Sequence, residues 1–162
     1  MAAASVANNS FKVEYIQPFI DSLKLLFESH LGHSLAIGKP HLNPTGRPAH
    51  EMSSVIVFHG TATGRAVLNL PTDVAEKLAV DFSQMDPLPD GLLEDCVGEL
   101  ANVIVGRAKA ALENHEITIS PPTIVKGTDY SITPQRGAAC LSIPCECKHG
   151  DVQFDISIVE PS

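Results

Sequence analysis

Residues 91–112 constrain the fold more than any other segment, because apolar side chains recur in them at helical spacing. At roughly 100° per residue these side chains fall within a wedge of about 100°, which predicts a long central helix with one apolar face. The apolar positions are Leu93, Val97, Leu100, Ala101, Ile104, Ala108 and Ala111.

The opposite side of this helix carries a cluster of polar side chains that is a candidate functional site. Asp95, Glu99, Asn102 and Gly106 fall within about 60° of one another. A carboxylate and an amide one turn apart, both facing solvent, can enter another molecule together. Gly106 removes side-chain bulk at a place where Ala would favour the helix by about 1 kcal/mol. A solvated face without function is the alternative, and the pattern alone leaves it open.

Length, composition and charge exclude several classes of protein. The chain has 162 residues and a formal net charge of −8, without a Lys/Arg cluster to neutralise phosphates, so nucleic acid is not an expected partner. It contains no apolar run long enough to span a bilayer, so we expect no membrane insertion. We expect residues 1–12 to form a mobile tail without signal-peptide features, and residues 13–162 to form a single cytoplasmic domain.

The four cysteines, Cys96, Cys140, Cys145 and Cys147, form no C-x-x-C pair. Disulfides are not expected either, because the expected compartment is reducing. In a strand, Cys145, Cys147 and His149 would share a face and resemble a metal site. A second ligand pair at zinc-finger spacing is missing, so ordinary strand residues are the favoured interpretation and no metal is expected. The sequence assigns no role to the cysteines.

The remaining pattern predicts an α+β fold in which a mostly antiparallel sheet packs with two or three helices. Two further helices are expected over residues 13–31 and from residue 72 onward, and short extended pieces over residues 33–48. Strands are expected over residues 52–59, 65–70, 117–125, 139–147 and 152–159, with Pro121 and Pro122 interrupting the third.

Three local details complete these expectations. Pro18 fits a helix best in its first turn, so the first helix should begin near residues 16–17. Thr72 or Asp73 should cap the second helix. Residues 139–147 or 152–159 could form a free edge strand that pairs with a second copy of the chain.

These residues resemble the CheX-type chemotaxis phosphatases, relatives of CheC and FliY. The family pattern of Asp or Ser, Glu four residues later and Asn three beyond is met by Asp95, Glu99 and Asn102. Similarity extends to residues 15–19, 38–40, 60–70, 98–106 and 122–127. The chain has one such helix rather than two, since residues 18–33 hold no E-x-x-N, and this favours the CheX branch.

The resemblance implies a phosphatase that removes phosphate from an aspartyl-phosphate on a CheY-like response regulator. Asn102 would then orient the attacking water, Glu99 would pair with the receiver's lysine, and Asp95 would assist docking. The protein would bring no cofactor of its own, with Mg²⁺ held by the receiver partner, and would form a homodimer. A non-catalytic receiver-binding module, or a flagellar or chemotaxis interaction module, is the alternative.

Overall fold

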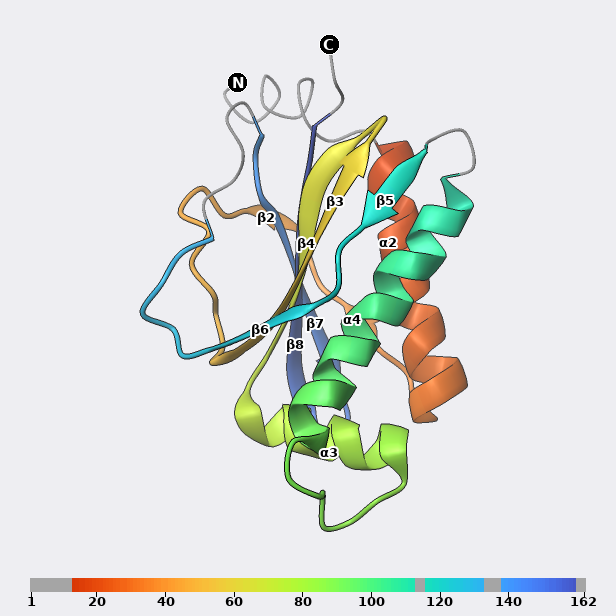
Figure 1. The fold of residues 1–162 in the computed structure, drawn as a ribbon, viewed down its shortest axis with the longest axis vertical. Coiled ribbons are helices and arrows are strands. Elements are labelled where there is room, and N and C mark those ends of the chain that lie inside the picture. Colours follow the sequence, from red (N-terminus) through yellow and green to blue (C-terminus); the bar gives the residue numbers. More distant parts are fainter. Residues whose placement is uncertain (1–12, 113–115, 133–137, 160–162) are drawn as a thin grey trace.

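Eight strands form a single sheet in the computed structural model, which describes residues 13–112, 116–132 and 138–159 (Figure 1). The tail predicted over residues 1–12 lies outside the described residues. The strands are β1 (Ala36–Ile37), β2 (His41–Leu42), β3 (Met52–Gly60), β4 (Thr63–Leu70), β5 (Ile117–Ile119), β6 (Thr123–Lys126), β7 (Leu141–Cys147) and β8 (Gly150–Val159). The helices are α2 (Val13–Leu26), the π-helical turn η1 (Phe27–Leu31), α3 (Thr72–Ser83) and α4 (Leu92–Ala111). The predicted α+β class is confirmed.

The sheet is antiparallel throughout, in the order β1-β7-β8-β4-β3-β5. Each edge is shared by two short strands, because β2 also pairs with β7 and β6 also pairs with β3. Both β7 and β8 therefore lie inside the sheet. The expectation that residues 139–147 or 152–159 form a free edge is wrong, because the short extended pieces after α2 return to cover β7.

The helices form a second layer over one face of the sheet. α2 and α4 run side by side across that face, and α3 packs at one end of it (Figure 1). Phe19 of α2 anchors the interface, since its ring lies 6.1 Å from that of Phe58 on β3 and 5.9 Å from that of Phe154 on β8. The core between the two layers thus joins helices and strands that are far apart in the sequence.

The first helix begins earlier than expected. α2 starts at Val13, so Pro18 lies in its second turn rather than its first. Proline costs the helix one backbone hydrogen bond there. Tyr15 and Ile16 are both buried against the core, and we attribute the extra turn to that burial. The helix ends beyond η1 at Gly32, whose φ of 77° is left-handed, as the sequence predicts.

The cap of α3 comes from a distant residue. Its N-cap position is Pro71, and the expected capping by Thr72 or Asp73 is wrong. Instead the backbone N–H of Thr72 donates to Oε1 of Glu51 at 2.9 Å, just before β3. This hydrogen bond from the Thr72 backbone lowers the pKa of Glu51. The carboxylate of Glu51, which directly precedes β3, thus caps the helix in place of the local side chain that the sequence predicts.

The hairpin of β3 and β4 follows the predicted glycine turn, with Phe58 opposite Gly64. A Cβ placed on Gly64 would lie 1.9 Å from the backbone oxygen of Ser157, so glycine is required where β4 passes β8. The extended segment after α4 is split at Pro121 and Pro122 into β5 and β6, as predicted. Among the described residues, no helix is long and apolar enough to cross a membrane.

Candidate functional site

The long helix α4 buries one broad side and exposes the other. Its buried residues are Cys96, Val97, Gly98, Leu100, Ala101, Ile104, Val105 and Ala108. This arc is wider than the predicted stripe, because α4 contacts α2, α3 and the sheet at once. Leu93 is only half-buried, and Ala111 is exposed, so the expectation that Ala111 belongs to the buried face is wrong. It lies in the last turn of the helix.

The four predicted site residues lie on the side of α4 that is turned away from this core. Asp95 and Glu99 are exposed, and Asn102 and Gly106 are half-buried. Within the described part of the chain, the side chains of Asp95, Glu99 and Asn102 have no hydrogen-bond or ion-pair partner. Their carboxylate and amide groups are therefore available to another molecule, while the helix holds them at a fixed spacing.

α4 is held close to the sheet beneath these residues. Gly98 faces the loop before β6, where a Cβ would lie 3.2 Å from Cγ of Pro122 and 3.9 Å from Cδ1 of Ile124. In the first turn of the helix, the carboxylate of Glu94 pairs with the ammonium of Lys126 at the end of β6. The hydrogen bond from Lys126 lowers the pKa of Glu94. These contacts fix the height and rotation of α4 over the sheet.

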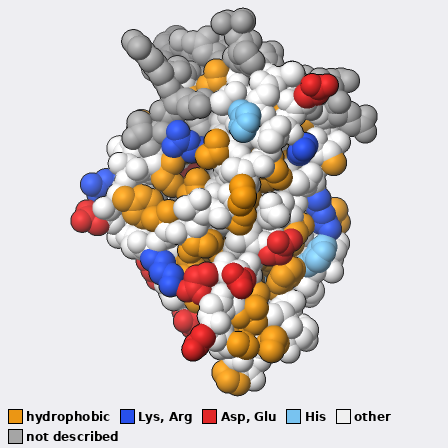
Figure 2. Space-filling view, in the orientation of Figure 1, with side chains coloured by type: hydrophobic (Ala, Val, Ile, Leu, Met, Phe, Trp, Pro, Cys, Tyr) orange, Lys and Arg blue, Asp and Glu red, His pale blue; other side chains and the backbone are white. Residues whose placement is uncertain are grey.

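The surface around the N-terminal half of α4 is acidic. Acidic side chains lie mostly over the lower half of the face shown in Figure 2, where α4 begins and α3 packs. A shallow open depression of about 400 Å³ lies here, between α3, the proline-rich loop over residues 86–90 and the first turn of α4. An acidic, shallow surface of this kind suits a protein partner with basic side chains rather than an enclosed small molecule.

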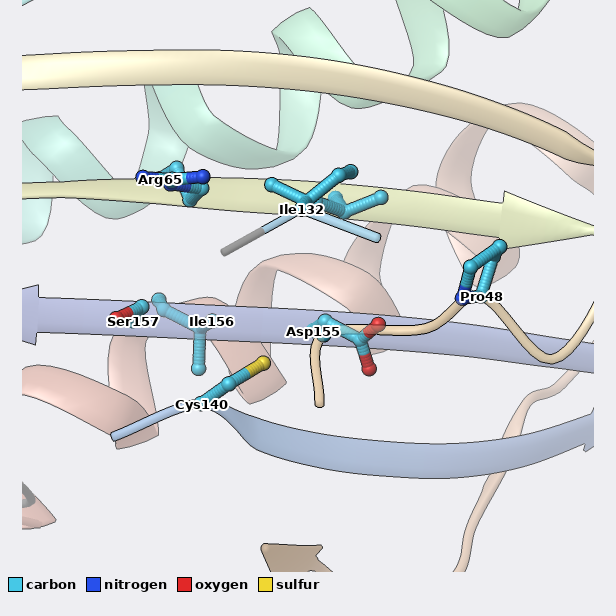
Figure 3. A pocket seen from close by; sticks show the side chains of 9 residues that line it. Pro48, Arg65, Ile132, Cys140, Asp155, Ile156 and Ser157 are labelled. Carbon is cyan, nitrogen blue, oxygen red and sulfur yellow. The ribbon is translucent and has the colours of Figure 1, made fainter. Parts of the chain in front are cut away.

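A small, partly open pocket lies on the opposite face of the sheet, away from α4 (Figure 3). Arg65 and Ser157 are paired across β4 and β8 and line it with Asp155, while the alternate residue Phe154 faces α2. Its volume of about 20 Å³ has room for roughly one water. Burial raises the pKa of Asp155, partly offset by hydrogen bonds. This pocket is too small for a substrate.

The cysteines are buried free thiols. Burial raises the pKa of Cys140 to about 12 and that of Cys145 to about 11, which makes both poor nucleophiles. The grouping of Cys145, Cys147 and His149 imagined from the sequence is not formed. His149 instead meets His33 and Asp81. Sequence reasoning missed that cluster, because its members lie far apart in the chain and show no spacing motif.

Fold and helix face together define a class: a helix-covered antiparallel sheet in which one long helix presents a Glu-x-x-Asn pair to solvent. A family model described as chemotaxis phosphatase CheX matches residues 52–146, more than half of the chain. The chain belongs to the CheX family. No curated protein was found to match it.

Solved structures agree on the fold. A CheC-like superfamily protein from Shewanella sp. PV-4 has a TM-score of 0.81 at 24% identity, covering 91% of this chain and 99% of that one. A chemotaxis protein CheX from Desulfovibrio desulfuricans has a TM-score of 0.78 at 21% identity, covering 91% and 99%. CheX from Borrelia burgdorferi, solved in a CheX-CheY-BeF3-Mg²⁺ complex, has a TM-score of 0.73 at 22% identity, covering 92% and 100%.

Proposed function

We propose that this protein hydrolyses the aspartyl-phosphate of a CheY-like response regulator. The observation that carries the proposal is the unpartnered pair of Glu99 and Asn102, one turn apart on the outer side of α4. Membership of the CheX family supports it, and the Borrelia burgdorferi complex of CheX with CheY supports a CheY-like partner.

The proposed mechanism rests on placement of a water molecule. A receiver domain already holds Mg²⁺ and a lysine beside its phosphoryl group, so the missing element is a water in line with phosphorus. The side-chain oxygen of Asn102 accepts a hydrogen bond from that water, and its nitrogen donates to a phosphoryl oxygen. Water oxygen then bonds to phosphorus, the bond from phosphorus to the aspartyl oxygen breaks, and phosphate leaves. The phosphatase itself contributes no cofactor.

Glu99 acts one turn earlier, as the group that sets the register of the complex. Its exposed carboxylate pairs with the receiver's lysine, a charge-assisted contact that fixes α4 over the phosphoryl group. Asp95 lies a further turn back and contributes to docking. Gly106 lies beyond Asn102, and a Cβ placed there would meet nothing within 4 Å apart from its own stretch of helix, so its missing side chain leaves room for the partner.

The same face of α4 would serve a protein that binds receivers without turning them over. Measuring phosphate release from phosphorylated CheY-like receivers, with wild type and Asn102→Ala in parallel, separates the two functions. Acceleration by wild type alone supports the phosphatase. Tight binding of the phosphorylated receiver without any acceleration would overturn catalysis and leave an interaction module.

The oligomeric state and location belong to the same proposal. We infer a homodimer, as the CheX resemblance implies, with the two-strand edges β1–β2 and β5–β6 as the sheet edges open to a second copy, and a cytoplasmic location, as expected from the sequence. Sedimentation that gave a monomer at micromolar concentration would remove the dimer.

A further inference from the structure

Three potential metal ligands, none of them on α4, meet at the end of the molecule where α3 lies. His33 follows Gly32 at the end of η1, Asp81 lies in the last turn of α3, and His149 lies in the turn between β7 and β8. The cluster therefore joins the first helical segment, α3 and the far hairpin of the sheet (Figure 1).

Both imidazoles point the same ring nitrogen at one carboxylate oxygen. Nε2 of His33 lies 3.1 Å from Oδ2 of Asp81, and Nε2 of His149 lies 2.8 Å from the same oxygen. One ligand atom from each of the three residues lies within 4.8 Å of the others. The two rings meet edge to face with their centroids 5.2 Å apart, so neither blocks the other's nitrogen.

The surroundings of the cluster hold its side chains in place, keep the carboxylate charged and leave the three residues accessible to solvent. Phe27 packs edge-on against His33 at 5.6 Å and holds that ring in place. The side chains of His33, His149 and Asp81 are 9%, 19% and 23% exposed, which leaves a path from solvent. Burial raises the pKa of Asp81, but hydrogen bonds from His149 and His33 outweigh it, so the pKa is lowered and the carboxylate stays ionised.

We propose that His33, Asp81 and His149 bind a divalent transition-metal ion of the Zn²⁺ type through Nε2, Oδ2 and Nε2. Two imidazoles and a carboxylate are ligands that Zn²⁺ accepts, with water completing a tetrahedron. Ligand atoms about 2.0–2.1 Å from zinc lie roughly 3.3 Å apart in a tetrahedron. The observed separations from the Asp81 oxygen, 3.1 Å for His33 and 2.8 Å for His149, are shorter than that by about 0.2 and 0.5 Å.

The ion would cross-link separate elements of the fold. It would tie α3, which packs against α4, to the β7–β8 hairpin and to the end of the first helix. Binding to the folded chain alone raises its stability by mass action. The inference stands independently of the proposed phosphatase, because no ligand of the cluster belongs to the Glu99 and Asn102 face.

Titration of the purified full chain with ZnCl2, followed by calorimetry and thermal unfolding, tests the proposal. We expect one ion per chain, a midpoint of unfolding that rises with Zn²⁺, and a loss of affinity of more than about tenfold in His149→Ala and in Asp81→Asn. His59→Ala is the matched control, since His59 is exposed on β3 and outside the cluster, and its affinity should equal wild type. His33→Gln serves where another variant fails to fold.

CoCl2 distinguishes this site from binding by cysteine. Visible d–d absorption without a thiolate charge-transfer band, lost in His149→Ala, agrees with the proposed ligands. A thiolate band, a wild-type affinity in His149→Ala and His33→Gln, or no binding of Zn²⁺ at all would overturn the proposal and leave a His–Asp–His hydrogen-bond network.

Discussion

Gly98 of α4 faces Pro122 of the loop before β6 so closely that a Cβ at Gly98 would lie 3.2 Å from Cγ of Pro122. This contact sets how deeply the helix sits on the sheet. Glu99 follows Gly98 directly, so the depth at which α4 packs also sets how far the Glu99 and Asn102 face stands out toward a partner.

Gly98→Val should destabilise the protein by about 1–3 kcal/mol, because the branched side chain must push α4 away from Pro122 and Ile124. Urea denaturation followed by circular dichroism measures the loss. Gly106→Val is the matched control on the same helix, where a new Cβ would meet nothing within 4 Å apart from its own stretch of helix. Its stability should stay within about 0.5 kcal/mol of wild type. Equal losses in the two variants would show that the contact with Pro122 does not limit the packing.

Asn102→Ala should lower phosphatase activity by about 10²-fold or more, because the water loses its orienting amide. Asn102→Asp should also fail, since a carboxylate keeps the size but cannot donate to a phosphoryl oxygen. Phosphate release from a phosphorylated receiver is the assay, with Glu146→Gln in β7, which pairs with β1, as the control. Full activity in Asn102→Ala, with an intact fold, would rule out the water-orienting role.

Glu99→Gln should weaken receiver binding about tenfold, or ~1.4 kcal/mol, and reduce the salt dependence of binding. The reason is the loss of one charge from a pair with the receiver's lysine. The dissociation constant of a receiver activated with BeF3 and Mg²⁺, measured at two salt concentrations, checks this. Glu146→Gln removes an exposed carboxylate elsewhere and should leave the constant unchanged. Identical behaviour of the two variants would contradict a docking role for Glu99.

Asp155→Asn should gain stability relative to wild type as pH rises from about 4 to about 7. Burial raises the pKa of Asp155, so the folded state keeps a proton that the unfolded state has already released. The contribution of protonated Asp155 to the free energy of unfolding is therefore complete below the pKa of the unfolded state. It is lost as the pH rises through the raised pKa of the folded state. Asparagine does not titrate and has no such loss. Unfolding curves of the two proteins that stay parallel across this pH range would contradict the raised pKa.

Local sequence patterns were enough to predict many of the helices and strands of this protein. Helical periodicity placed α4, and with it the shared orientation of Glu99 and Asn102, because a helix repeats every 3.6 residues whatever surrounds it. The glycines at 60 and 64 similarly predicted the β3–β4 hairpin, and Pro121 and Pro122 the break between β5 and β6. The family resemblance rested on these same local segments.

Contacts between distant segments were decided only by the tertiary structure. The side chain of Glu51 caps α3 across 21 residues, short strands cover β7, and Ala111 is exposed although helical periodicity places it on the apolar face. His33, Asp81 and His149 meet only once helix and hairpin have packed together. The sequence by itself determined which faces are apolar and which residues α4 presents. Packing determined which polar groups find partners, because those distances depend on the whole chain.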